Sequence, residues 1–308
     1  MGPLSQEFDT LRLASAVPLE RRDLGLSVLG TMMGLCQAEE PTLDDVVFLC
    51  VDCEAFEWEQ HKVTEIGVAV LDTRRLGVRT INLDPSAIDH YMQFAHFRPV
   101  EYSNLINRKF VKGCPDYFGF GKSTWIRLAD TRQLLARLFA DPSRLSEAAT
   151  FETPLLDKRN VVLVGHGIAN DASYLRQLGL NVDDIDNIIG RADTQRLAGV
   201  NMIALKKVLA GLNISAVNLH NAGNDAAYTL KALVKMVAVE AEQPEGVKMR
   251  LKQVRAKPPE IHDSTSKAEY VWGGTTSPGD EKCVRDSHRS KSQRWGRRVA
   301  TKHQDRGE

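Results

Sequence analysis

Runs of hydrophobic residues near the start of the chain predict three short strands. Val46 to Val51 are apolar at every position, which is typical of a strand buried on both faces of a sheet. Glu65 to Leu71 and Val78 to Leu83 are two further runs, and a short turn at 72–77 separates them. Two strands joined by a short turn form a hairpin. We therefore expect three consecutive antiparallel strands.

From residue 129 onward, the pattern alternates between helices and strands. The periodicity of 129–140 is helical, and the apolar run Val161 to Val164 predicts another buried strand. Further elements are expected as a helix from 172, a weak strand at 185–189, and helices at 202–212 and 225–239. A hairpin followed by strand-helix units predicts an α/β fold with a mixed five-stranded sheet. Three antiparallel strands come first, parallel β-α units follow, and helices cover both faces.

Two acidic residues, Asp52 and Glu54, stand at the end of the first predicted strand. Side chains alternate along a strand, so both carboxylates point to one side and Cys53 points to the other. Two like charges at this spacing repel each other, and a divalent cation that takes oxygen ligands relieves the repulsion. The alternative is a solvated turn at a strand end.

Two more acidic residues and a histidine stand where the predicted sheet would place them near the first pair. Asp171 opens a helix directly after the strand at 161–164. Asp225 stands at the start of the last long helix, and His220 precedes it by five residues in a loop. If the strand at 161–164 pairs beside the first strand, Asp171 lies near Asp52. His220 has a second interpretation, as a polar residue at a helix start.

Composition limits the class of protein. The chain has 308 residues, 43% of them hydrophobic, and no net charge, which suits one large domain or two small ones. The five cysteines are odd in number and scattered, which favours a reducing compartment over a disulfide framework. No stretch is long and apolar enough to span a bilayer. We expect no membrane partner and a cytoplasmic or nuclear location, or both.

The sequence divides into three regions. Residues 1–43 are expected to form a helical appendage with one amphipathic helix at 24–35. Residues 44–240 contain the predicted strands and helices. Residues 241–308 carry 15 basic and 10 acidic residues with few aliphatic ones, which predicts a disordered basic tail. Such a tail either binds nucleic acid non-specifically or is simply solvated, and the sequence leaves both open.

A long connection at 86–127 is rich in aromatic and basic residues. It holds nine of the chain's twenty aromatic residues, and six basic residues against three acidic ones. Aromatic rings stack on unpaired bases and cations follow phosphates, so this mixture suits a single-stranded nucleic acid. Packing as a small satellite core is the other interpretation. We call the segment an insertion, because ordinary connections are shorter.

The acidic motifs and the histidine resemble those of the DEDDh exonucleases of the ribonuclease-H-like superfamily. The resemblance covers about residues 44–240 and rests on three motifs in this order: Asp52-x-Glu54, Gly165-His166 with Asp171, and His220-x4-Asp225. Ala55, Gly167 and Asn170 depart from the residues that the family commonly has at these positions. The insertion also resembles one found in a fungal subfamily, most of whose members are uncharacterised.

The resemblance implies a ribonuclease-H-like fold and a metal-dependent 3′→5′ exonuclease that releases 5′-monophosphates from RNA or single-stranded DNA. It implies that four carboxylates hold two Mg²⁺ or Mn²⁺ ions: Asp52, Glu54, Asp171 and Asp225. His220 would remove a proton from the attacking water. Substrate contacts are expected at five further positions: Ala55, Phe56, Arg98, Lys109 and Asn170.

Two other functions fit parts of the sequence. A catalytically silent descendant would bind nucleic acid or a protein partner on the same fold, and the complete set of four acids and one histidine argues against it. A ribonuclease-H-like transferase or integrase is less consistent with the late spacing of His220 and Asp225. The sequence does not distinguish RNA from DNA, and it identifies no protein partner.

Overall fold

The structure is a computed structural model of the chain that describes residues 23–35, 45–76, 89–151 and 158–256. All of the described residues belong to one compact unit.

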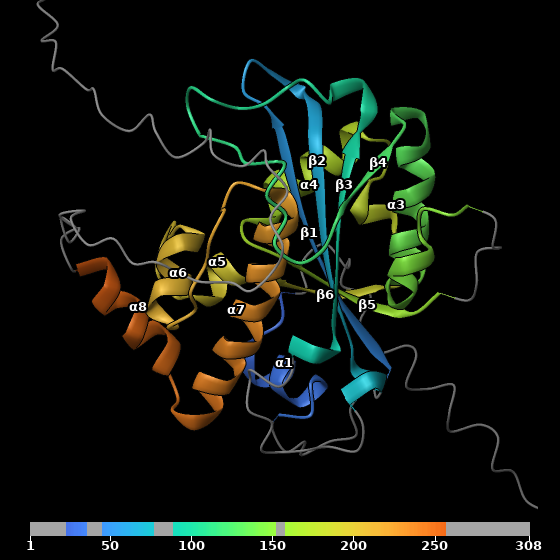
Figure 1. The fold of residues 1–308 in the computed structure, drawn as a ribbon. Helices are drawn as coiled ribbons and strands as arrows, with labels where there is room; N and C mark the ends of the chain where they lie inside the picture. The colour runs from blue at the N-terminus through green and yellow to red at the C-terminus, as the bar shows by residue number, and fades with distance from the viewer. Residues whose placement is uncertain (1–22, 36–44, 77–88, 152–157, 257–308) are drawn as a thin grey trace, which may run out of the picture. The chain divides into compact units, whose positions relative to one another are not determined.

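A six-stranded sheet organises the described residues (Figure 1). Its strands are β1 (Val46–Phe56), β2 (Glu59–Asp72), β3 (Met92–Pro99), β4 (Ser123–Ile126), β5 (Asn160–Gly165) and β6 (Ile188–Asp193). They lie in the order β4-β3-β2-β1-β5-β6. The pairs β1–β2 and β2–β3 are antiparallel and the other pairs are parallel. The predicted mixed α/β fold is therefore confirmed, with one strand more than the expected five.

The extra strand and the third antiparallel strand both come from the predicted insertion. The strand expected at 78–83 lies outside the described residues. In the structure β3 pairs with β2, and the short strand β4 adds to the edge beside β3. The first part of the insertion therefore belongs to the sheet, and the loop at 103–122 between β3 and β4 is the part without helix or strand. We call residues 103–122 the insertion loop.

Helices cover both faces of the sheet, as predicted. Their bounds are α1 (Leu26–Met32), α3 (Thr131–Ala140), α4 (Ile168–Gln177), α5 (Thr194–Leu197), α6 (Leu205–Gly211), α7 (Ala222–Glu242) and α8 (Gly246–Ala256). Short 3-10 helices are η3 (Thr73–Leu76), η4 (Asp89–Tyr91), η5 (Val100–Tyr102), η6 (Leu128–Asp130), η7 (Pro142–Glu147) and η8 (Val182–Asp184). Leucines of α3 and α4 pack in a core on one face, and α1 and α7 pack in a core on the other.

The alternation along β1 determines where its acidic residues point. Val47, Leu49, Val51 and Cys53 belong to the core on the α3–α4 face. Val46, Phe48 and Cys50 belong to the core on the α1–α7 face. Asp52 and Glu54 continue this second series, so their side chains leave β1 on the face that α7 covers. Cys53 points to the opposite face, as the sequence predicts.

Both ends of the folded region extend beyond the predicted boundaries. Leu29 of α1 is fully buried in the core beside α7, so this helix is an integral part of the fold and not an appendage. The prediction of a disordered tail from residue 241 is wrong for α8, whose Val247 and Leu251 are buried against α6 and α7. The average composition of this segment is basic and polar, so it does not reveal the apolar residues of α8 that pack against the fold. The remainder of the predicted tail lies outside the described residues.

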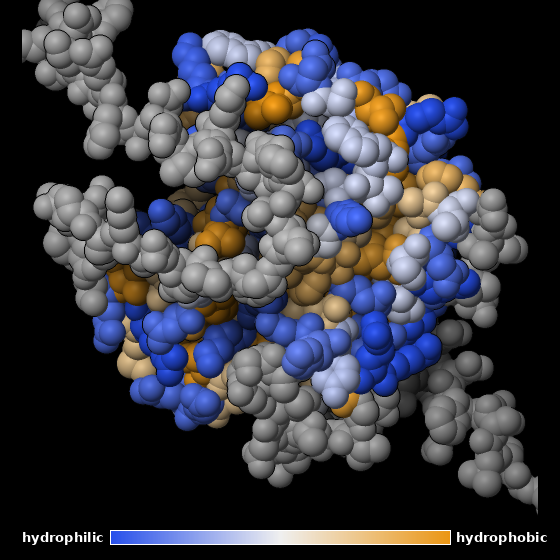
Figure 2. All heavy atoms as spheres, in the orientation of Figure 1, coloured by the Kyte–Doolittle hydropathy of each residue, from blue (hydrophilic) through white to orange (hydrophobic). Residues whose placement is uncertain are grey.

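The outer surface carries a mixture of residue types. On the face drawn in Figure 2, hydrophilic residues are widespread and hydrophobic ones form separate patches between them. None of the described helices has the length and apolar character needed to cross a bilayer.

Candidate functional site

The candidate site begins at the carboxyl end of β1, where Asp52 and Glu54 follow the buried run. Hydrogen-bonded pairing holds this part of β1 against β2, with Asp52 opposite Gly67 and Glu54 opposite Glu65. The register shifts directly after Glu54, and Thr64 donates its hydroxyl hydrogen to the carbonyl of Glu54 at 3.2 Å. The sheet therefore fixes the backbone from which both carboxylates project.

Asp171 reaches the same strand from the start of α4. The turn before the helix places Gly167 at φ 85°, a left-handed conformation that glycine adopts without steric cost. One turn later, the Asp171 carboxylate accepts a hydrogen bond from the Cys53 amide at 3.0 Å. β1 and β5 are neighbours, so this contact brings Asp171 beside Asp52, as the sequence predicts.

His220 lies two residues before α7, and Asp225 lies in the first turn of this helix. The Asp225 carboxylate accepts a hydrogen bond from the backbone amide of His220 at 2.9 Å. Asn221 caps the helix through its side-chain oxygen. Potential ligand atoms of Glu54, His220 and Asp225 all lie within 4.8 Å of one another. Asp52 and Asp171 are not in this tight group, but the charge of Asp171 raises the pKa of Glu54, and the charges of Asp225 and Glu54 raise the pKa of Asp52.

Burial and mutual repulsion disfavour negative charge at all four acidic residues. Burial raises the pKa of Glu54 to about 8, with a further contribution from the charge of Glu65. Burial likewise raises the pKa of Asp171 and of Asp225 to about 7 each. The pKa of Asp52 is raised well above its ordinary value, first by burial and then by the charges of Asp171 and Asp225. This crowding is what a bound cation would relieve.

The residues present fit a divalent metal site. One Asp225 oxygen, Oδ1, is buried without a hydrogen-bond partner among the described residues, although the other oxygen is bonded to His220. A buried carboxylate oxygen without a donor is costly, and a metal ion would satisfy it. An all-oxygen set of carboxylates is the donor type that Mg²⁺ and Mn²⁺ prefer.

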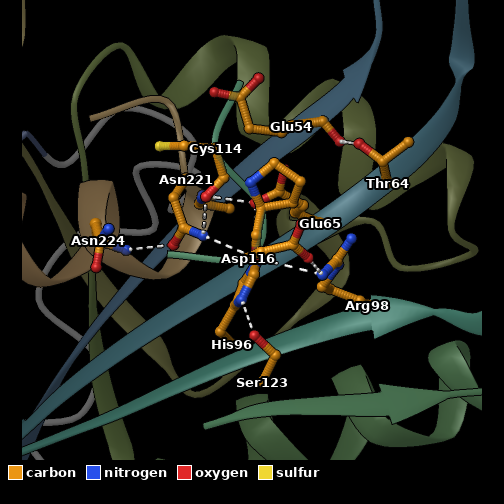
Figure 3. A network of polar contacts seen from close by, with 12 residues as sticks. Glu54, Thr64, Glu65, His96, Arg98, Cys114, Asp116, Ser123, Asn221 and Asn224 are labelled. Carbon is orange, nitrogen blue, oxygen red and sulfur yellow. Dashed lines mark hydrogen bonds and ion pairs between the residues drawn. The ribbon is translucent and has the colours of Figure 1, made fainter. Parts of the chain in front are cut away.

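A buried histidine–glutamate pair, missed in the sequence, lies beside Glu54 (Figure 3). The Glu65 carboxylate contacts His96 Nε2 at 3.0 Å and accepts a hydrogen bond from the Ala222 amide at 3.2 Å. His96 Nδ1 contacts the Ser123 hydroxyl at 2.8 Å, and the His96 side chain is fully buried. Glu65 thus links β2, β3 and the start of α7. Its only sequence signal is an acidic residue at the start of an apolar run.

Gly67 brings α7 against the sheet. A Cβ atom at this position would lie 1.8 Å from the carbonyl oxygen of Ala222 and 2.5 Å from the amide nitrogen of Gly223. Real Cβ atoms do not approach backbone so closely, so only glycine allows this contact. The start of α7 therefore rests directly on the backbone of β2, opposite Asp52.

The insertion loop holds the segment that carries His220. The Cys114 amide donates to the His220 carbonyl at 3.2 Å. The Asn221 side chain donates to the carbonyls of Cys114 and Pro115, each at 3.2 Å. The Asn224 side chain donates to the Tyr117 carbonyl at 2.8 Å and accepts from the Gly119 amide at 2.8 Å. Asn221 and Asn224 are both buried, so these bonds are shielded from water.

The predicted substrate residues have different surroundings. The substrate contact of Arg98 stays a prediction; in the structure Arg98 is buried, bonds to Asp116 at 2.6 Å and stacks 4.3 Å from the centre of the Trp125 ring. Its bond to Asp116 holds the insertion loop. Lys109 and Asn170 are exposed, Phe56 is half-buried, and the buried Ala55 lines a pocket beside Glu54. These four also stay predictions.

A larger pocket, of about 530 Å³, lies beside the start of α4 and is lined by none of the four candidate acids. The amides of Gly167 and Ile168 could hold an anion there, but both donate to the Asp193 carboxylate at 3.0 Å. His166 is also engaged nearby, through Thr194 and the carbonyl of Ile203. This pocket therefore has no free anion-binding helix start, and we place the candidate chemistry at the carboxylates.

The comparison with protein families agrees with this geometry. The DEDDh model described as "DNA polymerase III subunit epsilon-like, C-terminal domain" matches residues 47–236, which is more than half of the chain. The chain belongs to the DEDDh family, and the resemblance predicted from the sequence is confirmed.

Similar proteins occur in yeasts. The chain is 29% identical over 198 residues to the uncharacterized nucleolar protein C2C4.08 of Schizosaccharomyces pombe, covering 61% of this chain and 68% of that protein. It is 28% identical to the uncharacterized protein YDR514C of Saccharomyces cerevisiae, covering 62% of this chain and 41% of that protein. The "Good for full DBP5 activity protein 2" of the same yeast is 25% identical, with coverages of 65% and 37%.

A solved structure of the Saccharomyces cerevisiae Pan2 pseudoubiquitin hydrolase–RNA exonuclease module in complex with A7 RNA is also similar. It has a TM-score of 0.34 and 15% identity, over 74% of this chain and 35% of that one.

Proposed function

We propose that the chain is a metal-dependent 3′→5′ exonuclease that hydrolyses phosphodiester bonds of RNA or single-stranded DNA and releases 5′-monophosphates. One observation carries the proposal: acidic residues from β1, α4 and α7 and the histidine before α7 converge at one end of the sheet. Membership of the DEDDh family supports the same reaction class. The domain responsible would comprise residues 44–240 together with α1 and α8.

Asp52, Glu54, Asp171 and Asp225 would hold two Mg²⁺ or Mn²⁺ ions. When bound, such ions neutralise charge on the phosphoryl group and favour deprotonation of the attacking water. The chain's own contribution is position and proton transfer. His220 is exposed at the site, and its ring accepts the water proton near neutrality. Its pKa is lowered by desolvation and then by Lys206, so the ring is neutral at physiological pH and has a free nitrogen lone pair that can accept a proton.

The location and the partner follow from the same proposal. The substrate partner is a single-stranded polynucleotide. A nuclear location is supported by the word nucleolar in the name of the fission-yeast relative. We propose no membrane or protein partner.

The direct test is digestion of matched RNA and DNA oligomers that are labelled at either the 3′ or the 5′ end. With Mg²⁺ or Mn²⁺, we expect immediate release of the 3′ label as a mononucleotide and progressive shortening of the 5′-labelled strand. EDTA should stop both. Binding of the oligomers without any metal-dependent cleavage would contradict the proposal and favour the silent descendant.

Stability against pH gives a second readout. A carboxylate whose folded pKa is raised stabilises the fold when protonated, so the metal-free protein should lose stability as pH rises from about 4 to about 8. Bound Mg²⁺ or Mn²⁺ offsets the repulsion between the ionised groups. The metal should therefore raise the melting temperature most at pH 8 and least at pH 5. An equal effect at both pH values would contradict the assignment of these four ligands.

A further inference from the structure

Two exposed aromatic rings and a lysine form a small platform beside the candidate site. Trp58 lies at the tip of the β1–β2 hairpin and Phe110 lies in the insertion loop, and they are 57% and 67% exposed. Their ring centroids are 5.5 Å apart at an interplanar angle of 54°. The Lys109 ammonium lies 4.5 Å from the centre of the Trp58 ring. We call these three residues the aromatic platform.

Hydrogen bonds between the β1–β2 hairpin and the insertion loop hold the platform in place. The Glu57 carboxylate accepts bonds from three successive amides of the insertion loop, those of residues 108, 109 and 110, at 2.9 to 3.1 Å. Asn107 joins the same two segments, accepting from the Glu57 amide and donating to the Ala55 carbonyl, both at 2.8 Å. The rings are therefore exposed on a backbone that is already ordered, which lowers the entropy cost of binding a flat ligand.

A pocket lies between Phe110 of the platform and the candidate metal ligand Glu54. It measures about 190 Å³, and Ala55 and Val111 also line it. Tyr174, three residues after Asp171 on α4, closes a further side. The volume is well below the roughly 300 Å³ at the lower end of sites for complete small-molecule ligands. It suits a single planar ring system that belongs to a longer molecule.

The charges around the platform favour an anionic polymer. Arg108, Lys109 and Lys112 are all exposed in the same stretch of the insertion loop. The acidic side chain of Glu57, next to Trp58 in the chain, accepts hydrogen bonds from three backbone amides. Aromatic faces with interleaved cations are the recurring chemistry of single-stranded nucleic acid recognition, in which rings stack on bases and cations follow phosphates.

We propose that the aromatic platform binds an unpaired nucleobase of the polynucleotide, in a nucleotide next to the bond that is cleaved at Glu54. This inference rests on the proposed function, because it places the scissile phosphate at the carboxylates. A base in a duplex has both faces stacked and its edge paired, so the platform also selects single-stranded 3′ ends.

The test measures binding without turnover. A 5′-fluorescein single-stranded oligomer is titrated in EDTA, and a second oligomer of equal length lacks the bases of its last three nucleotides. Trp58→Ala and Phe110→Ala should each weaken binding of the first oligomer roughly 5- to 100-fold, the range for loss of one base-stacking contact. On the abasic oligomer, both variants should match the parent, because the base they would contact is missing.

Val100→Ala is the control, because Val100 is an exposed hydrophobic residue of the same predicted insertion, is 43% exposed, and neither belongs to the platform nor lines the pocket. It should bind both oligomers as the parent does, and melting temperatures should show that all variants are folded. Equal losses on both oligomers, or an equal loss in Val100→Ala, would contradict the proposed role of the platform. Metal-dependent cleavage by the parent distinguishes this failure from failure of the exonuclease proposal.

Discussion

The acidic residues of β1 and the histidine before α7 meet at one site, but the fold positions them in different ways. Asp52 and Glu54 lie on a strand that pairs with β2 and whose neighbour β5 leads into Asp171. His220 lies in an irregular segment at φ 68°, a left-handed conformation uncommon for a residue with a side chain. Contacts from the insertion loop hold it there.

The sheet therefore determines the positions of Asp52 and Glu54, whereas the insertion loop determines the position of His220. The backbone of β1 would keep its place through ladder hydrogen bonds if the insertion loop moved. The backbone of His220 depends on Cys114 and on Asn221, whose partners are in the loop. The candidate metal ligands and the candidate base should therefore respond to different substitutions.

The largest effect is expected from Asp52→Asn, which keeps the shape of the side chain and removes its charge. Loss of a ligand should reduce turnover by more than about 10⁴-fold, because the metal contribution exceeds that of a general base. The melting temperature without metal should hold or rise at pH 8, because the raised pKa of Asp52 shows that its charge is unfavourable in the fold. Near-normal turnover in Mg²⁺ would show that the metal assignment is wrong.

His220→Ala should have the next largest effect, a loss of roughly 10²- to 10⁴-fold in kcat, the range for general acid-base catalysis. Metal binding, measured by calorimetry, should be retained, because the carboxylates remain. Hydroxide from solvent can replace the missing base, so raising the pH should narrow the gap to the parent. An active parent whose rate and pH profile are unaffected by this substitution would place the base elsewhere.

A pair of hydrogen-bond deletions tests the comparison directly. Asn221→Asp keeps the side-chain oxygen that caps α7 but removes the amide hydrogens that bond to the carbonyls of Cys114 and Pro115. We expect kcat to fall roughly 10- to 100-fold, because His220 shifts. Thr64→Val removes a bond to the carbonyl of Glu54, and we expect about twofold or less because the ladder persists. Equal losses of kcat in both variants, at unchanged KM, would contradict the distinction between residues positioned by the sheet and residues positioned by the insertion loop.

The smallest effect concerns the charge near His220. Desolvation and then Lys206 lower the pKa of His220, and Lys206→Gln removes the second cause. The acidic limb of the pH–rate profile should move to slightly higher pH, because the ring then holds its proton more tightly. Lys207→Gln is the matched control, since Lys207 is the next exposed lysine of α6. The shift should be smaller at high salt. If the acidic limb does not move in Lys206→Gln, the limb reports the titration of a group other than His220.

Much of the candidate site could be predicted from local sequence. The alternation along β1 places Asp52 and Glu54 on one face, and the position of Asp171 after β5 follows from parallel pairing. These predictions succeed because each depends on a period or on the order of neighbouring elements. The sequence also predicts Asp225 at the start of the long helix α7.

Other parts of the fold and of the site could not be predicted, because they depend on contacts between residues that are distant in the sequence. β3 contains His96 and Arg98, polar residues whose burial is possible only because Glu65 and Asp116 meet them in the fold. A pattern based on hydrophobicity therefore did not place a strand there. β4 has four residues, of which Thr124 and Trp125 are exposed, and it carries no alternation of its own. Only the neighbouring strand shows that it belongs to the sheet.

The side chain of Gly67 is a single hydrogen atom, and the close contact between β2 and α7 depends on it. Replacing it with a methyl group would push α7 away from β2, and with it Asp225 and the segment that carries His220. Gly67→Ala would thus keep all five candidate catalytic residues in the sequence while separating them in space. Among relatives with the same acids and histidine, the residue aligned with position 67 becomes an independent indicator of whether the site can assemble.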